Sequence, residues 1–221
     1  MIITEILPLG AKKSKVLTDE DFAFSLYRGE VKKMELEVGR ELTAEFLQTK
    51  LYPLLIRRSR ERLLYLLKQR DYTEAELRRK FREGFYPEEI AELALDYGRK
   101  LHYVDDRRVA ETYIRTRSGE KSARYLKTAL LNRGIDKELI EELLEEEAPD
   151  ETAQICRELK KRHYAADIDK KEEQRIFAAL LRKGYSYSAI RDAISRLQDQ
   201  VGQSEIIPPA NCSERTFGGV D

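Results

Sequence analysis

Residues 77–97 read LRRKFREGFYPEEIAELALDY, and the pattern returns as KTALLNRGIDKELIEELLEEE at 127–147 and as FAALLRKGYSYSAIRDAISRL at 177–197. The three segments centre on Gly84, Gly134 and Gly184, which follow one another at intervals of fifty residues. A glycine after a helix can take the left-handed backbone conformation at little cost, so each is predicted to end one helix. Self-similarity at such a period is typical of repeat architectures. The chain is therefore predicted to contain three copies of one helical unit.

Apolar residues keep fixed distances from each glycine, as expected of helices that bury one stripe. They stand three positions before it, one after it and six after it: Phe81, Phe85 and Ile90, then Leu131, Ile135 and Ile140, then Leu181, Tyr185 and Ile190. Start signals follow the glycines, with a first-turn proline at Pro87 and N-caps at Asp136 and Ser186. Residues 73–76 (TEAE) form a capping box before the first glycine. Each unit is predicted to have three helices that need neighbours to cover them.

The first fifty residues have a different period. Phe22, Phe24 and Leu26 alternate along a predicted strand, which needs partners in a hairpin or a three-stranded sheet. A short helical stretch is predicted at 29–34, and a helical period then starts that Pro53 interrupts.

These patterns predict a mainly α fold, with three tandem three-helix repeats in an elongated arrangement and a small β-rich module at the N-terminus. The predicted boundaries are the β-rich module at 1–50, a linker helix and the first repeat at 51–105, the second repeat at 106–150 and the third at 151–197. Residues 198–221 are rich in Gly and Pro and poor in aliphatic residues, which predicts a disordered tail.

The composition excludes several classes of protein. Lys and Arg number 41 and Asp and Glu number 41, so the chain is highly charged but balanced overall. No apolar run is long enough to cross a bilayer and no signal peptide is evident, which predicts a cytoplasmic protein without a membrane partner. The two cysteines, Cys156 and Cys212, lack the spacing of a disulfide framework or a zinc site.

Catalytic and cofactor sites are not indicated either. His102 and His163 stand in no metal-ligand spacing, and no phosphate-binding, dinucleotide-binding or serine-hydrolase motif is present. We therefore predict a macromolecule-binding scaffold with no catalytic residue, no metal and no cofactor.

Charge is sorted by helix. In the first two repeats the helix before the glycine is basic and the helix after it is acidic. One interpretation is that the basic helices line up into a stripe that meets phosphates or an acidic protein, formed by Arg57, Arg58, Arg60, Arg78, Arg79, Arg82, Lys121, Arg124, Lys127 and Arg133 and joined by Arg62. An acidic face for protein contact would comprise Glu88, Glu92, Glu141 and Glu145. The alternative is internal, with basic and acidic helices exchanging surface salt bridges. The third repeat departs from this polarity.

A helix-turn-helix reader of DNA is a further hypothesis. The acidic last helices of the first two repeats disfavour it, because phosphates would repel them in the major groove. Helical tyrosines such as Tyr65 and Tyr125 are interpreted as core residues with surface hydroxyls, and stacking on single-stranded bases is the alternative.

Three quoted stretches together resemble the RecX family of bacterial regulatory proteins. They are YTEAELRRKFREGFYPEEIAE (72–92), LHYVDDRRVAETYIRTR (101–117) and KTALLNRGIDKELIEELLEE (127–146), within a resemblance that covers about residues 59–197. The resemblance implies a monomeric cytoplasmic modulator that lies along the RecA filament on single- or double-stranded DNA and restrains its ATPase and strand exchange. A helical DNA-binding module that acts independently of RecA is the alternative.

Overall fold

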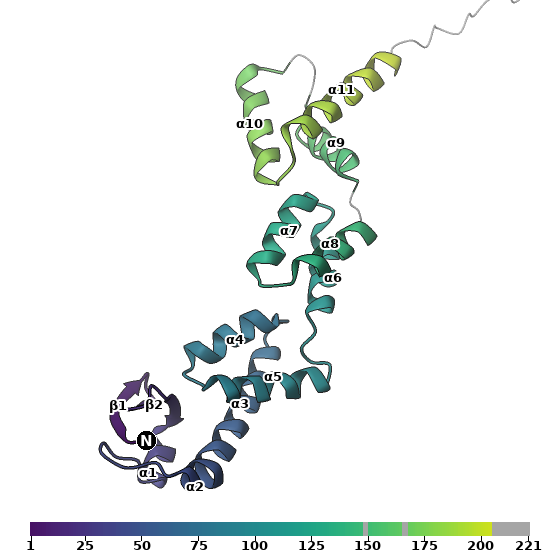
Figure 1. Cartoon of the computed structure of the whole chain (residues 1–221). Helices are drawn as coiled ribbons and strands as arrows, with labels where there is room; N and C mark the ends of the chain where they lie inside the picture. Colours follow the sequence, from purple (N-terminus) through teal and green to yellow (C-terminus); the bar gives the residue numbers. More distant parts are fainter. Residues whose placement is uncertain (148–149, 165–167, 205–221) are drawn as a thin grey trace, which may run out of the picture. The chain divides into compact units, whose positions relative to one another are not determined.

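The structure is a computed structural model that describes residues 1–147, 150–164 and 168–204. The chain begins with a small β-sheet. Strands β1 (Ile3–Leu9), β2 (Lys13–Thr18) and β3 (Ala23–Tyr27) pair antiparallel in that order (Figure 1). The predicted alternation is confirmed, because Phe24 and Leu26 are buried and Phe22 packs against the same core. Helix α1 (Arg28–Lys33) follows, as the short helical stretch predicted.

Pro53 does not interrupt the helix in the way predicted. Helix α2 (Ala44–Phe46) passes through a π-helical turn, η1 (Leu47–Leu51), into α3 (Tyr52–Leu67). The backbone N–H of Tyr52 donates to the carbonyl of Leu47 in this wider turn. A proline lacks the N–H for a regular bond and its ring crowds the preceding turn, and a π turn at that place relieves both conflicts.

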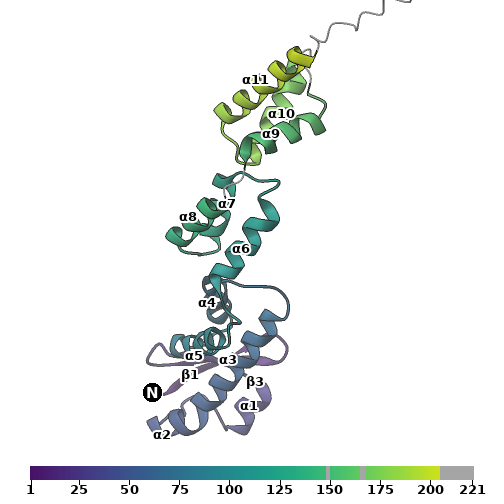
Figure 2. The ribbon, with the colours of Figure 1, turned by 90° about the vertical axis from the view of Figure 1, so that its right-hand side faces the viewer.

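The first repeat consists of α3, α4 (Glu74–Glu83) and α5 (Glu88–Lys100) and shares one hydrophobic core with the sheet. Figure 2 shows the sheet beside α3 and α5. The Ser25 hydroxyl donates to the Gly84 carbonyl at 2.7 Å, which ties β3 to the turn between α4 and α5. The strands and the first repeat thus form one body, with no break in the core at the predicted boundary near residue 50.

The second repeat consists of α6 (Asp106–Arg117), α7 (Ala123–Asn132) and α8 (Lys137–Glu146), and the third of α9 (Glu151–Lys161), α10 (Lys170–Arg182) and α11 (Tyr187–Ser204). Each has its own cluster of buried apolar side chains. The chain divides into two compact units: Met1–Arg117 with Leu126–Glu147, and Ser118–Tyr125 with the described part of Ala148–Asp221. The predicted mainly α fold with three-helix repeats and a β-rich start is confirmed.

Helix α11 extends past residue 197, where the tail was predicted to begin. The loss of apolar periodicity therefore does not coincide with the end of the helix, since Gln and Asp cost a helix far less than Gly or Pro. The remainder of the predicted tail, from residue 205 on, lies outside the described residues. Within the described ranges no helix is long and apolar enough to cross a membrane.

The three glycines are not equivalent in the structure. Gly134 and Gly184 take the predicted left-handed conformation, with φ of 82° and 92°. Gly84 has φ of −86°, and the left-handed residue of the first repeat is Phe85, with φ of 55°. Each glycine does end a helix, as predicted, but the left-handed conformation is found at the glycine only in the second and third repeats. In the first repeat α4 runs one residue closer to its glycine, and the next residue, Phe85, takes that conformation.

This one-residue offset also changes which side chains are buried. At all three turns a backbone N–H donates to the carbonyl of the residue five positions earlier. These hydrogen bonds run from Tyr86 to Phe81, from Ile135 to Leu130 and from Tyr185 to Leu180. These six side chains are buried. Leu131 and Leu181, predicted to lie in the buried stripe, are 40% and 46% exposed. The structurally equivalent residues Phe81 and Leu130 are 49 residues apart, whereas Leu130 and Leu180 are 50 apart. A sequence alignment on the three glycines therefore misplaces the first repeat by one residue relative to the structure.

Candidate nucleic-acid interface

The turn of the second repeat docks on the middle helix of the first, within the first compact unit. Thr73 caps α4 and its hydroxyl donates to the Arg133 carbonyl at 2.7 Å. A β-carbon on Gly134 would lie under 3.0 Å from the β-carbon of Ala75. Gly134 is thus required twice, by its φ and by the close approach of α4.

A buried carboxylate completes this junction. Glu76 is only 6% exposed and accepts hydrogen bonds from the Arg133 guanidinium at 3.0 and 3.2 Å and from the Thr73 N–H at 3.1 Å. Arg70 adds a third partner at 3.2 Å. Burial alone would raise the pKa of Glu76, but these donors outweigh it and lower the pKa to about 2. Arg133, predicted to contact DNA, instead joins two repeats.

The second compact unit contains an equivalent junction, formed by different residues. Ser122 is buried, caps α7 and donates its N–H to the Lys183 carbonyl at 3.2 Å. A β-carbon on Gly184 would lie 2.8 Å from the β-carbon of Tyr125. Glu151 accepts from the Ala123 N–H at 2.8 Å. A hydroxyl residue at the start of the middle helix therefore meets the glycine turn of the following repeat at both junctions.

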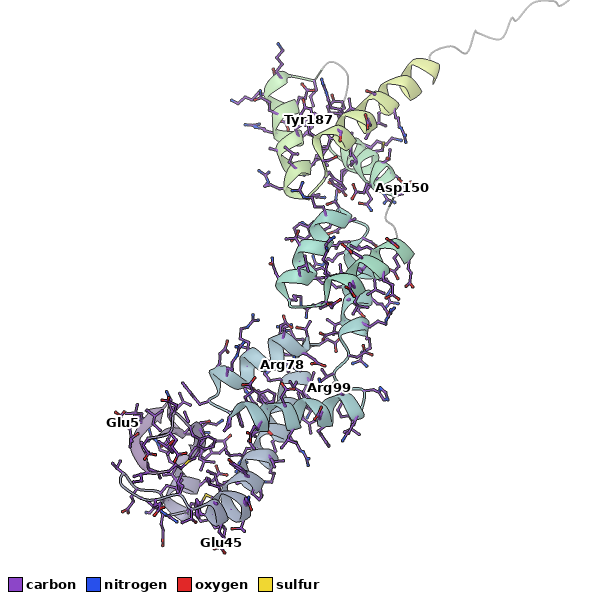
Figure 3. All side chains as sticks on the ribbon, in the orientation of Figure 1. Glu5, Glu45, Arg78, Arg99, Asp150 and Tyr187 are labelled. Carbon is purple, nitrogen blue, oxygen red and sulfur yellow. The ribbon has the colours of Figure 1, made fainter. Side chains whose placement is uncertain are left out.

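The opposite charges of the middle and last helices pair inside each of the first two repeats. Arg78 on α4 donates to Glu92 on α5 at 2.7 and 3.1 Å. Lys127 on α7 likewise donates to Glu141 on α8. The two pairs are equivalent in the repeat, because each of the four residues stands five positions after the N-cap of its helix. Figure 3 labels Arg78 and Arg99, which lie side by side because both bind Glu74 and Glu92. The internal interpretation of the charge pattern thus accounts for Arg78, Lys127, Glu92 and Glu141.

The other basic residues predicted for the stripe differ in exposure and in their contacts. Arg58 is held by Glu30 at 2.5 Å and by Glu61 at 2.6 Å, and Arg57 lies 3.5 Å from Glu61. Arg60 is exposed and stacks 4.9 Å above the Tyr97 ring. Lys121 lies 4.3 Å from the Tyr125 ring and Arg124 is exposed, both within the second compact unit.

Arg79 and Arg82 remain available on the exposed side of α4. Both side chains are exposed, and no ion pair is formed by either among the described residues. On the acidic side Glu88 and Glu145 are exposed and likewise unpaired in that part of the chain. The charges left for a partner in the first repeat are thus fewer than the sequence pattern predicts, and they include both signs.

Basic residues of the sheet were missed by reasoning on helices. Lys13 and Lys15 lie two positions apart on β2 and point to one face, where Lys15 stacks 4.1 Å above the Phe85 ring. Lys13 lies between the rings of Tyr27 and Tyr86 at 5.1 and 5.6 Å. The alternation of Lys13, Ser14 and Lys15 on a strand was the available signal.

Metal ligation finds no support in the described residues. No cluster of three or more His, Cys, Asp or Glu side chains there could hold a metal ion. His102 and His163 both adopt left-handed conformations, with φ of 56° and 54°, immediately after helices α5 and α9. Their role in the fold is therefore that of turn residues.

Two family models match the chain: "RecX, second three-helix domain" at residues 105–144 and "RecX, third three-helix domain" at residues 148–194. A regulatory protein RecX of Neisseria meningitidis serogroup A is 30% identical over 142 residues, which cover 64% of this chain and 92% of that protein. The regulatory protein RecX of Clostridium acetobutylicum is 29% identical over 204 residues, covering 88% of this chain and 95% of the relative. A crystal structure of a regulatory protein RecX is similar with a TM-score of 0.55 and 24% identity, over 86% of this chain and 98% of that one, which supports the fold.

Proposed function

Because this chain belongs to the RecX family, we propose that it is a regulatory protein that binds the RecA filament on DNA and restrains RecA ATPase and strand exchange. The resemblance seen in the sequence and the relatives named regulatory protein RecX support this function. The proposal includes action as a cytoplasmic monomer without catalysis of its own.

The exposed charges of the first repeat indicate which residues make the contact. After the internal pairs are formed, α4 still presents Arg79 and Arg82 to solvent while α5 presents Glu88. A surface with both signs can meet phosphates and a basic protein surface at neighbouring points, and such complementarity sets orientation as well as attraction. We therefore assign the contact to these free charges and not to Arg78, Lys127 or Arg133.

The test is the single-strand-DNA-dependent ATPase of the cognate RecA with stoichiometric amounts of this protein. The wild-type chain is expected to lower the rate of ATP hydrolysis by RecA, and an unchanged rate would contradict the regulatory proposal. If the chain binds DNA yet leaves the ATPase unchanged, the alternative of an independent DNA-binding module replaces it.

A charge-reversed pair, Arg79→Glu with Arg82→Glu, tests the assignment. It should weaken filament binding and reduce the salt dependence by roughly 1.8 units of the log–log slope if both residues meet duplex phosphates. The matched control is Lys32→Glu with Lys33→Glu, the same charge change on the exposed surface of α1. Equal binding by the Arg79/Arg82 variant and the wild type would place the interface elsewhere.

A further inference from the structure

A pocket between the sheet and α3 gathers cations and tyrosine rings. Its volume is about 380 Å³, and it is lined by Lys13, Tyr27, Arg58, Arg62, Tyr65 and Tyr86 together with one acid, Glu61. All of these belong to the first compact unit, and they come from β2, β3, α3 and the turn after α4. The pocket is therefore built by the contact of the N-terminal sheet with the first repeat.

The cations converge on the rings at short range. Lys13 and Arg58 lie 5.1 and 4.9 Å from the centre of the Tyr27 ring. Arg62 lies 5.6 Å from the centre of the Tyr65 ring. The Tyr65 side chain is 55% exposed although a helical tyrosine was expected to be a core residue. An exposed ring beside a guanidinium is the arrangement that stacks on planar groups.

Among these cations, the nearby acids pair only with Arg58. Glu30 is engaged by the Arg58 guanidinium and by the Tyr27 N–H at 2.9 Å, and Glu61 pairs with Arg58 and Arg57. Neither Lys13 nor Arg62 forms an ion pair with any described residue.

The pKa of Lys13 is affected by its burial and by the positive charge that surrounds it. Burial and the charge of Arg62 lower the pKa of Lys13, and the attraction of Glu30 does not restore it. A bound anion between the two cations would remove that repulsion.

We propose that this pocket binds a nucleotide, with its phosphate between Lys13 and Arg62 and its base stacked on Tyr65. Guanidinium and ammonium groups are the usual protein partners of phosphate, and an aromatic ring supplies the stacking surface. The volume is at the small end of the range for small-molecule sites, about 300–1,000 Å³. An acidic peptide would satisfy the cations and leave the tyrosine face unused. The nucleotide is either free or part of a single strand, and the inference rests on the nucleic-acid part of the proposed function.

The experiment measures binding of the full-length protein to a labelled single-stranded oligothymidylate by fluorescence anisotropy, without RecA. Unlabelled duplex, adenosine 5′-monophosphate and inorganic phosphate serve as competitors. The variant Lys13→Glu with Arg62→Glu should bind at least about tenfold more weakly, and Tyr65→Ala at least about fivefold more weakly. The control Lys32→Glu with Lys33→Glu should match the wild type, and Lys13→Arg should retain binding because it keeps the charge. Far-ultraviolet circular dichroism checks that each variant is folded.

Competition distinguishes the two sources. Displacement by the mononucleotide indicates a free nucleotide site, and displacement by single strands alone indicates a strand site. Undiminished binding by a folded Lys13/Arg62 double variant overturns the proposal, as does an equal loss in the Lys32/Lys33 control. Loss of binding in the double variant with no effect of Tyr65→Ala overturns the stacking and leaves only charge. Since RecA is absent, these outcomes are independent of the ATPase test.

Discussion

Replacing Gly134 by alanine should be far more damaging than the same change at Gly84, although the two glycines match when the repeats are aligned by sequence. A residue with a β-carbon at φ of 82° costs about 1–2 kcal/mol. The new β-carbon would also lie under 3.0 Å from that of Ala75, and overpacking of this kind costs about 1–3 kcal/mol. The two effects together predict a loss of about 2–5 kcal/mol in the free energy of unfolding.

Gly84→Ala is the matched comparison. Its φ of −86° suits alanine, and its β-carbon would lie 3.1 Å from two carbons of the Tyr86 ring and 3.3 Å from the Lys80 carbonyl. Small movements relieve such contacts, so the expected loss is under about 1 kcal/mol.

Urea unfolding followed by circular dichroism at 222 nm measures the overall change, and amide hydrogen exchange on α4 and α8 assigns it to the first compact unit. Adding Ala75→Gly to Gly134→Ala removes the clashing side chain and should recover the steric part but not the backbone part. Losses at Gly84 and Gly134 that agree within about 0.5 kcal/mol would refute the reasoning, because additive errors at independent sites are of that size.

Three further changes test the contacts around these turns. Glu76→Gln should cost about 2–3 kcal/mol at pH 7, because the pKa of Glu76 is lowered to about 2 in the folded protein and water that reaches Arg70 weakens the effect only in part. This stabilisation is complete above pH 4.5 and is lost as the pH falls towards 2, so urea midpoints of mutant and wild type that differ equally at pH 7 and pH 2 would contradict it. A double-mutant cycle on Arg78 and Glu92 should give a coupling of about 0.3–1 kcal/mol that shrinks in high salt, since both side chains are partly exposed, and a salt-independent coupling above about 2 kcal/mol would be inconsistent with that. Ser25→Ala should cost about 1–2 kcal/mol by leaving the Gly84 carbonyl without its partner, with thermal unfolding as the measurement and an unchanged midpoint as the contrary result.

The candidate site was only partly predictable from the sequence. The sorting of basic and acidic helices was visible in the residues around Arg78 and Glu92, but whether such charges face a partner or one another depends on distances across the helix pair. Arg133 illustrates the difficulty, because nothing near it in the sequence indicates that Glu76, 57 residues earlier, receives its guanidinium. The pocket around Lys13 was missed since its walls come from four separate elements.

The sequence by itself determined the three-fold repeat, the helices and their caps, and the small sheet at the start. These follow from local physics: apolar periodicity, the capping box at Thr73 and the conformational freedom of glycine act within a few residues of one another. The tertiary structure alone decided the register of the first repeat, where Phe85 and not Gly84 takes the left-handed conformation, and it decided which arginines remain free. The physical reason is that both depend on contacts between distant segments, such as Ser25 on the Gly84 carbonyl and Ala75 against Gly134, which no local pattern encodes.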